Sequence, residues 1–177
     1  GTDIDEIMSE IKPNTRLIYL ESPSSVVFRL QNLQQIAAIA KKYNIATAID
    51  NTWATPLFQK PLALGIDLEI HSCSKYLGGH SDIVSGVLIG CEKLIDAIHV
   101  REYELLGAKM APAEASLLLR SLRTLDLRMD RHQQNALKIA EFLNSHPQIA
   151  LVNYPGLESF PQSELAQQQM SGFSGLM

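Results

Sequence analysis

The sequence predicts an α/β fold with a mainly parallel sheet, and three observations carry this prediction. Short apolar segments alternate with stretches of helical periodicity over roughly the first half of the chain. The apolar segments are apolar on both faces, which is typical of parallel strands that are covered by helices on each side. The connections between the segments are short, as they are in strand–helix–strand units.

The first half of the chain justifies these elements in order. Thr2 is expected to cap a short acidic helix that ends at Lys12-Pro13-Asn14, because proline breaks a helix. Buried strands are expected where apolar runs end in small or polar residues, and a helix where apolar residues recur every three or four positions. The expected strands span residues 16–21, 45–49, 68–73 and 85–90, and the expected helix spans residues 31–43.

The pattern changes after Gly90 and becomes mainly helical. Helical spacing predicts three helices, the last of them long and amphipathic and ended by Pro147. These helices are expected at residues 92–106, 112–123 and 128–144, and a short strand at residues 149–152. We expect a domain boundary near Thr124, with residues 1–123 in a large domain and residues 124–177 beginning a smaller α+β C-terminal domain.

Composition excludes several classes of protein. Of the 177 residues, 46% are hydrophobic and 19% charged, which is typical of a globular domain rather than a disordered chain. The net charge is −4 and there is no basic tract, so we expect no nucleic-acid partner. No apolar run is long enough for a membrane span, and Gly1-Thr2-Asp3 is not expected to begin a signal peptide, because no basic start or apolar segment follows. We therefore expect a cytoplasmic protein, and the lack of an initiator Met suggests a piece of a longer one.

One lysine stands out because of the residues around it. Lys75 follows the third expected strand and precedes the pair Gly78-Gly79, with Ser72 and Ser74 shortly before it. The edge of an α/β sheet where strands end is where ligands bind. Hydroxyl groups can bind a phosphate, and a primary amine can form a Schiff base with a carbonyl cofactor. A single lysine after a strand is nevertheless usually a solvated surface residue, so Lys75 needs a second observation.

Asp50 provides that observation, because it ends the preceding buried strand. Asp50 and Lys75 should therefore lie at the same edge of a parallel sheet. A buried carboxylate needs a cationic partner, and a protonated pyridine nitrogen would serve. An aspartate for the pyridinium and a lysine for the Schiff base are what proteins contribute to pyridoxal phosphate chemistry. Trp53, the only tryptophan, either lines this pocket or belongs to the core.

Several motifs resemble the trans-sulfuration family of pyridoxal-phosphate enzymes, which includes cystathionine β-lyase, cystathionine γ-synthase, cystathionine γ-lyase and methionine γ-lyase. The resemblance runs through nearly the whole chain and is strongest at the lysine motif. Residues 50–54 and 137–156 look most like bacterial cystathionine β-lyases. The motifs are Glu21-Ser22-Pro23, Asp50-Asn51-Thr52, the run from His71 to Asp82, and the run from Arg120 to Leu125.

The resemblance implies a role for each of five residues. Lys75 matches the Schiff-base lysine, and Asp50 matches the partner of the pyridinium. Ser72 and Ser74 match hydroxyls that bind the cofactor phosphate. Ser25 stands where many members have an Asn beside the phenolic oxygen of the cofactor, and this departure leaves its contact open. The resemblance further implies an aspartate-aminotransferase-like (fold type I) cofactor domain, pyridoxal 5'-phosphate as cofactor, and a homotetramer when intact.

The implied activity is a carbon–sulfur lyase of methionine biosynthesis, which cleaves cystathionine to homocysteine, pyruvate and ammonia. The other trans-sulfuration reactions remain alternatives. The family's glycine-rich phosphate loop, ring-stacking tyrosine and carboxylate-binding arginine match no position here, so we expect residues 1–177 alone to be inactive. That absence also leaves open a non-catalytic chain that binds the cofactor weakly or packs against a partner.

Two other kinds of site are disfavoured by the sequence. A nucleotide-binding α/β module lacks support, because no Gly-x-Gly-x-x-Gly fingerprint occurs. We also expect no metal site, because His80 has no second ligand at zinc spacing. His80 and Asp82 are better interpreted as residues of a hydrogen-bonded turn, and His71 as a partly buried histidine whose hydrogen bonds are satisfied.

Overall fold

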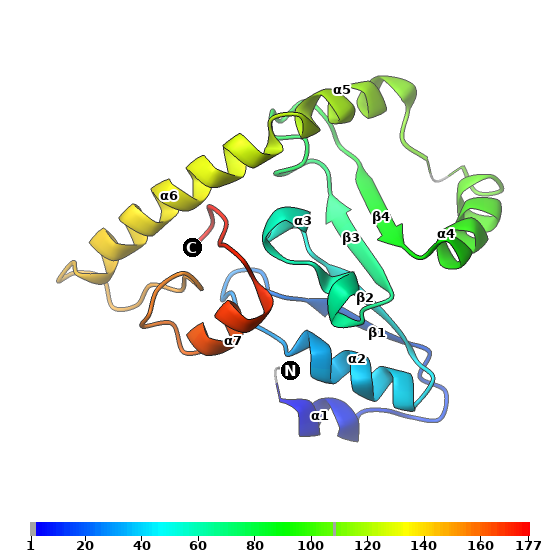
Figure 1. Ribbon diagram of the computed structural model, residues 1–177, viewed down its shortest axis with the longest axis horizontal. Helices are drawn as coiled ribbons and strands as arrows, with labels where there is room; N and C mark the ends of the chain where they lie inside the picture. Colours follow the sequence, from blue (N-terminus) through cyan, green and yellow to red (C-terminus); the bar gives the residue numbers. More distant parts are fainter. Residues whose placement is uncertain (1–2, 108) are drawn as a thin grey trace.

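A four-stranded sheet forms the centre of the fold in the computed structural model, which describes residues 3–107 and 109–177 (Figure 1). The strands lie in the order β1-β2-β3-β4. The first three are mutually parallel, and β4 runs antiparallel to β3. They are β1 (Leu17–Glu21), β2 (Ala46–Asp50), β3 (Leu68–Ser72) and β4 (Gly86–Gly90). The predicted α/β fold with a mainly parallel sheet is therefore confirmed.

Helices account for about half of the remaining described residues. They are α1 (Ile4–Ser9), α2 (Leu33–Lys42), α3 (Thr55–Phe58), η1 (Pro61–Leu64), α4 (Glu92–Ile98), η2 (His99–Tyr103), α5 (Pro112–Leu122), α6 (Leu125–Asn144) and α7 (Ser163–Gln169). No helix in the described ranges is both long and apolar enough to cross a bilayer.

Several predicted boundaries change in the structure. Asp3 caps α1, since its side chain accepts a hydrogen bond from the Asp5 N–H at 2.8 Å, whereas Thr2 lies outside the described residues. In place of one helix over residues 92–106, the structure has the α-helix α4, which ends at Ile98, followed by the π-helical turn η2, which ends at Tyr103. The long helix α6 begins at Leu125, three residues earlier than predicted.

The predicted strand over residues 149–152 is wrong. This segment is irregular and pairs with no strand of the described chain. Its four residues are apolar enough to resemble a strand, but without a neighbour their backbone groups would gain no ladder hydrogen bonds. The short helices α3, η1 and α7 were not predicted, because a helix of one or two turns shows too little periodicity.

One face of the sheet is buried and the other is open. Leu20 and Ile49 point toward α2, where they meet Leu33 and Ile36 in an apolar cluster. This is the helical face that the spacing of α2 predicts. On the opposite face, Tyr19 keeps 58% of its surface exposed. Asp50 is two residues after Ala48, which pairs with Tyr19, so its side chain lies on the same open face, which α2 does not cover.

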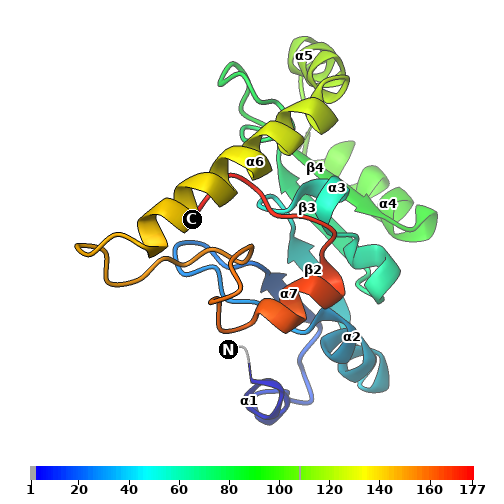
Figure 2. The same cartoon turned by 60° about the vertical axis from the view of Figure 1, so that its left-hand side comes forward.

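The chain after α6 folds back onto the sheet region. In Figures 1 and 2 the long helix α6 (yellow) runs along one side of the molecule, and the chain end (red) lies beside it. Tyr154 and Phe160 share an apolar cluster with Trp53 and Phe28. Residues on both sides of Thr124 therefore contribute to one core, and the division at residue 123 stays a prediction.

Candidate functional site

Lys75 lies in a tight turn that is anchored on both sides. The Gly78 N–H donates to the Cys73 carbonyl at 2.9 Å, and the Gly79 N–H donates to the Lys75 carbonyl at 2.7 Å. Cys73 and Leu77 are buried in a cluster with Ile83, whereas Lys75 is exposed. The buried side chains of Cys73 and Leu77 therefore fix the turn against the core, whereas the side chain of Lys75 stays accessible to a ligand.

Asp50 lies at the carboxyl end of β2 and is linked to β3 through Thr52. The Asp50 Oδ1 accepts a hydrogen bond from the Thr52 N–H at 2.9 Å. The Thr52 hydroxyl in turn accepts one from the Ser72 N–H at 2.8 Å. The ends of β2 and β3 are thus tied together, and the side chains of Asp50 and Ser72 share one sheet face.

Ser25 uses its hydroxyl within the protein. It donates to the Glu21 Oε1 at 2.6 Å, from the loop that follows β1. A serine hydroxyl has a single proton, so this bond leaves it able only to accept from a further partner. An Asn, which the resemblance implies for many members at this position, would offer two protons, so the contact of Ser25 with a cofactor stays a prediction.

A pocket of about 280 Å³ brings three of the predicted residues together. Asp50, Lys75 and Ser25 line it, with Glu21 and Trp53. Trp53 belongs to the core as well, because its ring packs against Phe28 with centroids 6.0 Å apart. Trp53 thus belongs to the core and also lines the pocket, and its contact with a cofactor stays a prediction.

Ser74 and Ser72 are placed differently. Ser74 lines a neighbouring pocket of about 260 Å³ together with Lys75, Tyr76, Ser81 and His132. Its hydroxyl accepts a hydrogen bond from the Ser85 N–H at 3.3 Å. Ser72 lines neither of these two pockets. Lys75 and Tyr76 line both pockets, so the lysine stands between a pocket with carboxylates and a pocket with hydroxyls.

The first pocket combines two carboxylates, Glu21 and Asp50, with the amine of Lys75. Burial, and then the negative charges of Asp50 and Glu21, raise the pKa of the Tyr19 hydroxyl above its ordinary value. Within the described part of the chain, neither Asp50 nor Lys75 takes part in an ion pair. A carboxylate without a cation, a free amine and nearby hydroxyls fit the ring nitrogen, the aldehyde and the phosphate of pyridoxal phosphate.

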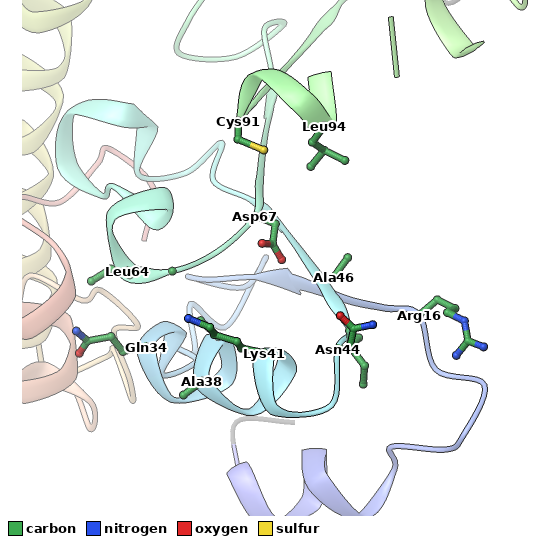
Figure 3. Close-up of a pocket in the computed structure, with 13 residues that line it drawn as sticks. Arg16, Gln34, Ala38, Lys41, Asn44, Ala46, Leu64, Asp67, Cys91 and Leu94 are labelled. Carbon is green, nitrogen blue, oxygen red and sulfur yellow. The ribbon is translucent and has the colours of Figure 1, made fainter. Parts of the chain in front are cut away.

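A larger cavity, of about 740 Å³, lies near the amino ends of β2 and β3 (Figure 3). Its acidic group is already engaged, because Asp67 accepts hydrogen bonds from both the N–H and the hydroxyl of Thr47 at 2.8 Å. Its cations, Arg16 and Lys41, point in opposite directions in Figure 3. Size alone therefore does not make this cavity the functional site, because its side chains do not converge on a ligand.

A buried polar network behind the site was not predicted. The Asn51 side-chain amide donates to the Glu69 Oε1 at 2.7 Å, and the His71 Nε2 lies 2.6 Å from the same oxygen. The Gln59 amide donates to the Asn51 Oδ1 and to the Ser22 carbonyl. His71 is fully rather than partly buried, and its Nδ1 has no hydrogen-bond partner among the described residues. The alternation of Glu69 and His71 with apolar residues on β3 was the available signal.

Comparison with known proteins shows which enzymes this chain is similar to. The chain is 44% identical over 176 residues to an L-methionine gamma-lyase from Pseudomonas putida, covering 99% of the chain and 44% of that protein. It is 42% identical to a cystathionine beta-lyase from Lactococcus lactis subsp. cremoris, covering 99% of the chain and 46% of that protein. Other relatives are named cystathionine gamma-synthase and cystathionine gamma-lyase. The chain thus spans about half the length of the curated relatives it matches.

A solved structure shows the same fold. Cystathionine gamma-lyase from Lactobacillus plantarum, complexed with L-serine, superposes with a TM-score of 0.94 at 38% identity, covering 98% of this chain and 46% of that one. The predicted fold type I architecture is therefore confirmed. The model of one family, described as Cys/Met metabolism PLP-dependent enzyme, matches residues 1–177. From its lysine turn, its sheet and this match over its whole length, the chain belongs to the Cys/Met metabolism family of pyridoxal-phosphate-dependent enzymes.

Proposed function

We propose that the full-length protein is a pyridoxal-phosphate-dependent carbon–sulfur lyase that cleaves cystathionine to homocysteine, pyruvate and ammonia. The observation that carries this proposal is the convergence on one pocket of Asp50, at the end of β2, and Lys75, in the turn after β3. The family match and the relatives named as lyases support the same class of reaction. Residues 50–54 and 137–156, which resemble cystathionine β-lyases, favour β-cleavage of cystathionine over the alternatives.

Each proposed residue has a defined task. When bound, pyridoxal phosphate supplies an aldehyde that combines with amines and a ring that withdraws electrons. Lys75 would hold the aldehyde through its amine, and the same amine, when free, would remove the proton from the substrate Cα. Asp50 keeps a proton on the ring nitrogen, since a carboxylate stabilises that positive charge. Ser72 and Ser74 donate hydrogen bonds to the phosphate.

The carbon–sulfur bond then breaks at the substrate Cβ. The leaving thiolate would take a proton from Lys75 and become homocysteine. Over the whole reaction, cystathionine and one water molecule give homocysteine, pyruvate and ammonia. Lys75 acts first as a base and then as an acid, which requires that its amine reach both Cα and the sulfur.

The other trans-sulfuration reactions differ in which bond breaks, so the products decide between them. Cleavage at Cγ of cystathionine yields cysteine and 2-oxobutyrate, and cleavage at Cγ of methionine yields methanethiol and 2-oxobutyrate. A synthase instead joins cysteine to an activated homoserine. The identities to γ-lyases, γ-synthases and β-lyases lie within a few per cent of one another, so identity does not rank these reactions.

The experiment uses the full-length protein loaded with pyridoxal phosphate. Borohydride reduction followed by peptide mapping should place the pyridoxyl label on Lys75, and label on another lysine alone contradicts the assignment. Incubation with cystathionine should give pyruvate and homocysteine by mass spectrometry, whereas 2-oxobutyrate identifies a γ-lyase. A protein that binds the cofactor without forming any product supports the non-catalytic alternative instead.

A further inference from the structure

Arg128, in the first turn of α6, donates hydrogen bonds into the turn that carries Lys75. Its Nη1 donates to the Tyr76 carbonyl at 2.6 Å. Its Nη2 lies 3.5 Å from the Leu77 carbonyl and donates to the Ser121 carbonyl at 2.9 Å. Its Nε donates to the Thr124 hydroxyl at 3.2 Å. One guanidinium therefore joins the two peptide units after Lys75 to the junction between α5 and α6.

The acceptors of Arg128 are all neutral. Within the described ranges, no carboxylate forms an ion pair with it. Burial lowers the pKa of Arg128, because the guanidinium loses part of its hydration at this position. A lysine presents a compact charge, whereas an arginine presents a rigid fork of five N–H donors. Four separate acceptors in different directions need such a fork, so the geometry of this residue matters more than its charge.

The absence of a side chain at Gly79 allows Arg128 to approach the turn that carries Lys75. Gly79 has a φ of +71°, which favours glycine. A Cβ at this position would also collide with the guanidinium of Arg128. The N–H of the same Gly79 donates to the Lys75 carbonyl at 2.7 Å. The residue that closes the Lys75 turn is thus the residue against which Arg128 lies.

We propose that Arg128 is the positioning residue of Lys75: it fixes the turn from Lys75 to Gly79 on the α5–α6 junction and so sets the direction of the lysine amine. This inference rests on the proposed role of Lys75. Arg128 is not a ligand of the substrate, because its donors are occupied by carbonyl and hydroxyl groups of the protein. A shift of about 1 Å in a reacting group can cost roughly a hundredfold in rate, which is the size of effect that such positioning controls.

The test compares substitutions of Arg128 with a matched arginine in the full-length protein loaded with pyridoxal phosphate. Arg131 lies on the same helix and is exposed, so Arg131→Met serves as the control. Arg128→Met should lower kcat by roughly ten- to hundredfold with KM changed less than about threefold, because orientation and not binding is lost. The visible circular dichroism of the bound cofactor should change as well. Arg131→Met should leave all three quantities at their parental values.

Arg128→Lys separates the fork from the charge and decides the matter if Arg128→Met does not fold. It keeps the positive charge but reaches fewer carbonyls, so kcat should fall by roughly three- to tenfold with an altered dichroism spectrum. Parental kcat and an unchanged spectrum in Arg128→Lys overturn the proposal. A lower melting temperature with parental kcat and dichroism in Arg128→Met also overturns it, because the role is then structural only.

Gly79→Ala approaches the same contact from the other side. Its Cβ should displace the guanidinium, so its loss of kcat should be smaller in an Arg128→Met background than in an Arg131→Met background. Equal losses in both backgrounds contradict the proposed contact. Borohydride mapping of the parent distinguishes the two levels of failure: label elsewhere than Lys75 contradicts the proposed function, whereas label on Lys75 with unaffected Arg128 variants contradicts only this inference.

Discussion

Glu21 and Asp50 are directly paired across β1 and β2, so two carboxylates end neighbouring parallel strands on the same face of the sheet. Neighbouring strands lie about 4.8 Å apart, a distance at which like charges repel. Glu21 accepts a hydroxyl hydrogen bond from Ser25, and Asp50 accepts a backbone N–H. A cation between these groups and the rest of the pocket would relieve the repulsion, which is what a protonated ring nitrogen offers.

Asp50→Asn should therefore impair turnover strongly, because the amide keeps the shape of the carboxylate but not its charge. A charge-assisted hydrogen bond contributes about 1.5–3 kcal/mol, which corresponds to roughly a ten- to hundredfold fall in kcat. Asp50→Glu should recover part of the loss. Steady-state kinetics of the full-length protein with saturating cofactor measure the effect, and parental turnover of Asp50→Asn would rule out the proposed role.

Glu21→Gln is the neighbouring change and should act more weakly. The carboxylate of Glu21 accepts a hydrogen bond from Ser25. Glu21 ends β1, which lies one strand further from Lys75 than β2, so we do not propose it as the partner of the ring nitrogen. We expect less than about a threefold change in kcat, with a modest loss of cofactor affinity from the reduced negative potential. Fluorescence titration with pyridoxal phosphate measures that affinity. A larger effect on kcat than that of Asp50→Asn would exchange the roles of the two carboxylates.

The buried network behind the site should be important for stability. Glu69→Ala removes the carboxylate oxygen that Asn51 and His71 share, so each of these buried side chains loses one hydrogen-bond partner. A buried donor that loses its acceptor costs about 1–3 kcal/mol, and the urea midpoint should fall accordingly. Glu69→Gln keeps an acceptor oxygen and should recover much of the loss. Glu158 is exposed, so Glu158→Ala is the control and should change the midpoint little.

The sequence was sufficient to predict the elements that carry strong periodicity and those that carry the lysine. The strands β1 to β4 and the helices α2 and α5 lie where the apolar pattern places them, because burial and periodicity are both local in the sequence. Asp50 and Lys75 were expected at one sheet edge, and both line one pocket. This step succeeds because parallel strands necessarily end at the same edge.

What the sequence could not predict depends on contacts between distant segments. Ser72 faces the same side as Asp50 but lies outside the two pockets beside Lys75, since its position depends on the turn that follows. Arg128 lies 52 residues after Tyr76, whose carbonyl it binds, and no spacing rule links the two. The turn of residues 149–152 away from the sheet likewise depends on the core that Tyr154 and Phe160 share with Trp53.

Tyr154 should make stability depend on alkaline pH. Its hydroxyl donates to the Ser174 carbonyl at 3.0 Å, and burial, with a contribution from Tyr76, raises its pKa above the ordinary value. The unfolded chain therefore ionises first, and stability is complete below pH 10 and falls as the pH rises above it. Tyr154→Phe should lose about 1 kcal/mol at neutral pH but show a weaker loss between about pH 9 and pH 11. Urea unfolding at each pH measures both effects.

The exposed Tyr43 provides the control for this experiment. Tyr43→Phe removes a tyrosine without removing a buried hydroxyl, so its stability should follow the parental pH dependence. If Tyr154→Phe and the parent lose stability in parallel up to about pH 11, the hydroxyl of Tyr154 does not ionise with unfolding, and its burial has no consequence for the pH dependence.

Residues 1–177, expressed by themselves, should bind pyridoxal phosphate weakly and give no pyruvate from cystathionine. The open face of the sheet exposes Leu17, Tyr19 and Leu88, and apolar surface of this kind promotes association between copies. The segment also corresponds to only 44–46% of the two curated relatives compared above, whose remaining length would supply further groups of the site. Light scattering, cofactor titration and a coupled pyruvate assay measure the three quantities. Tyr19→Lys with Leu88→Lys should restore solubility without activity; turnover in this soluble variant would mean that the segment already contains a complete site.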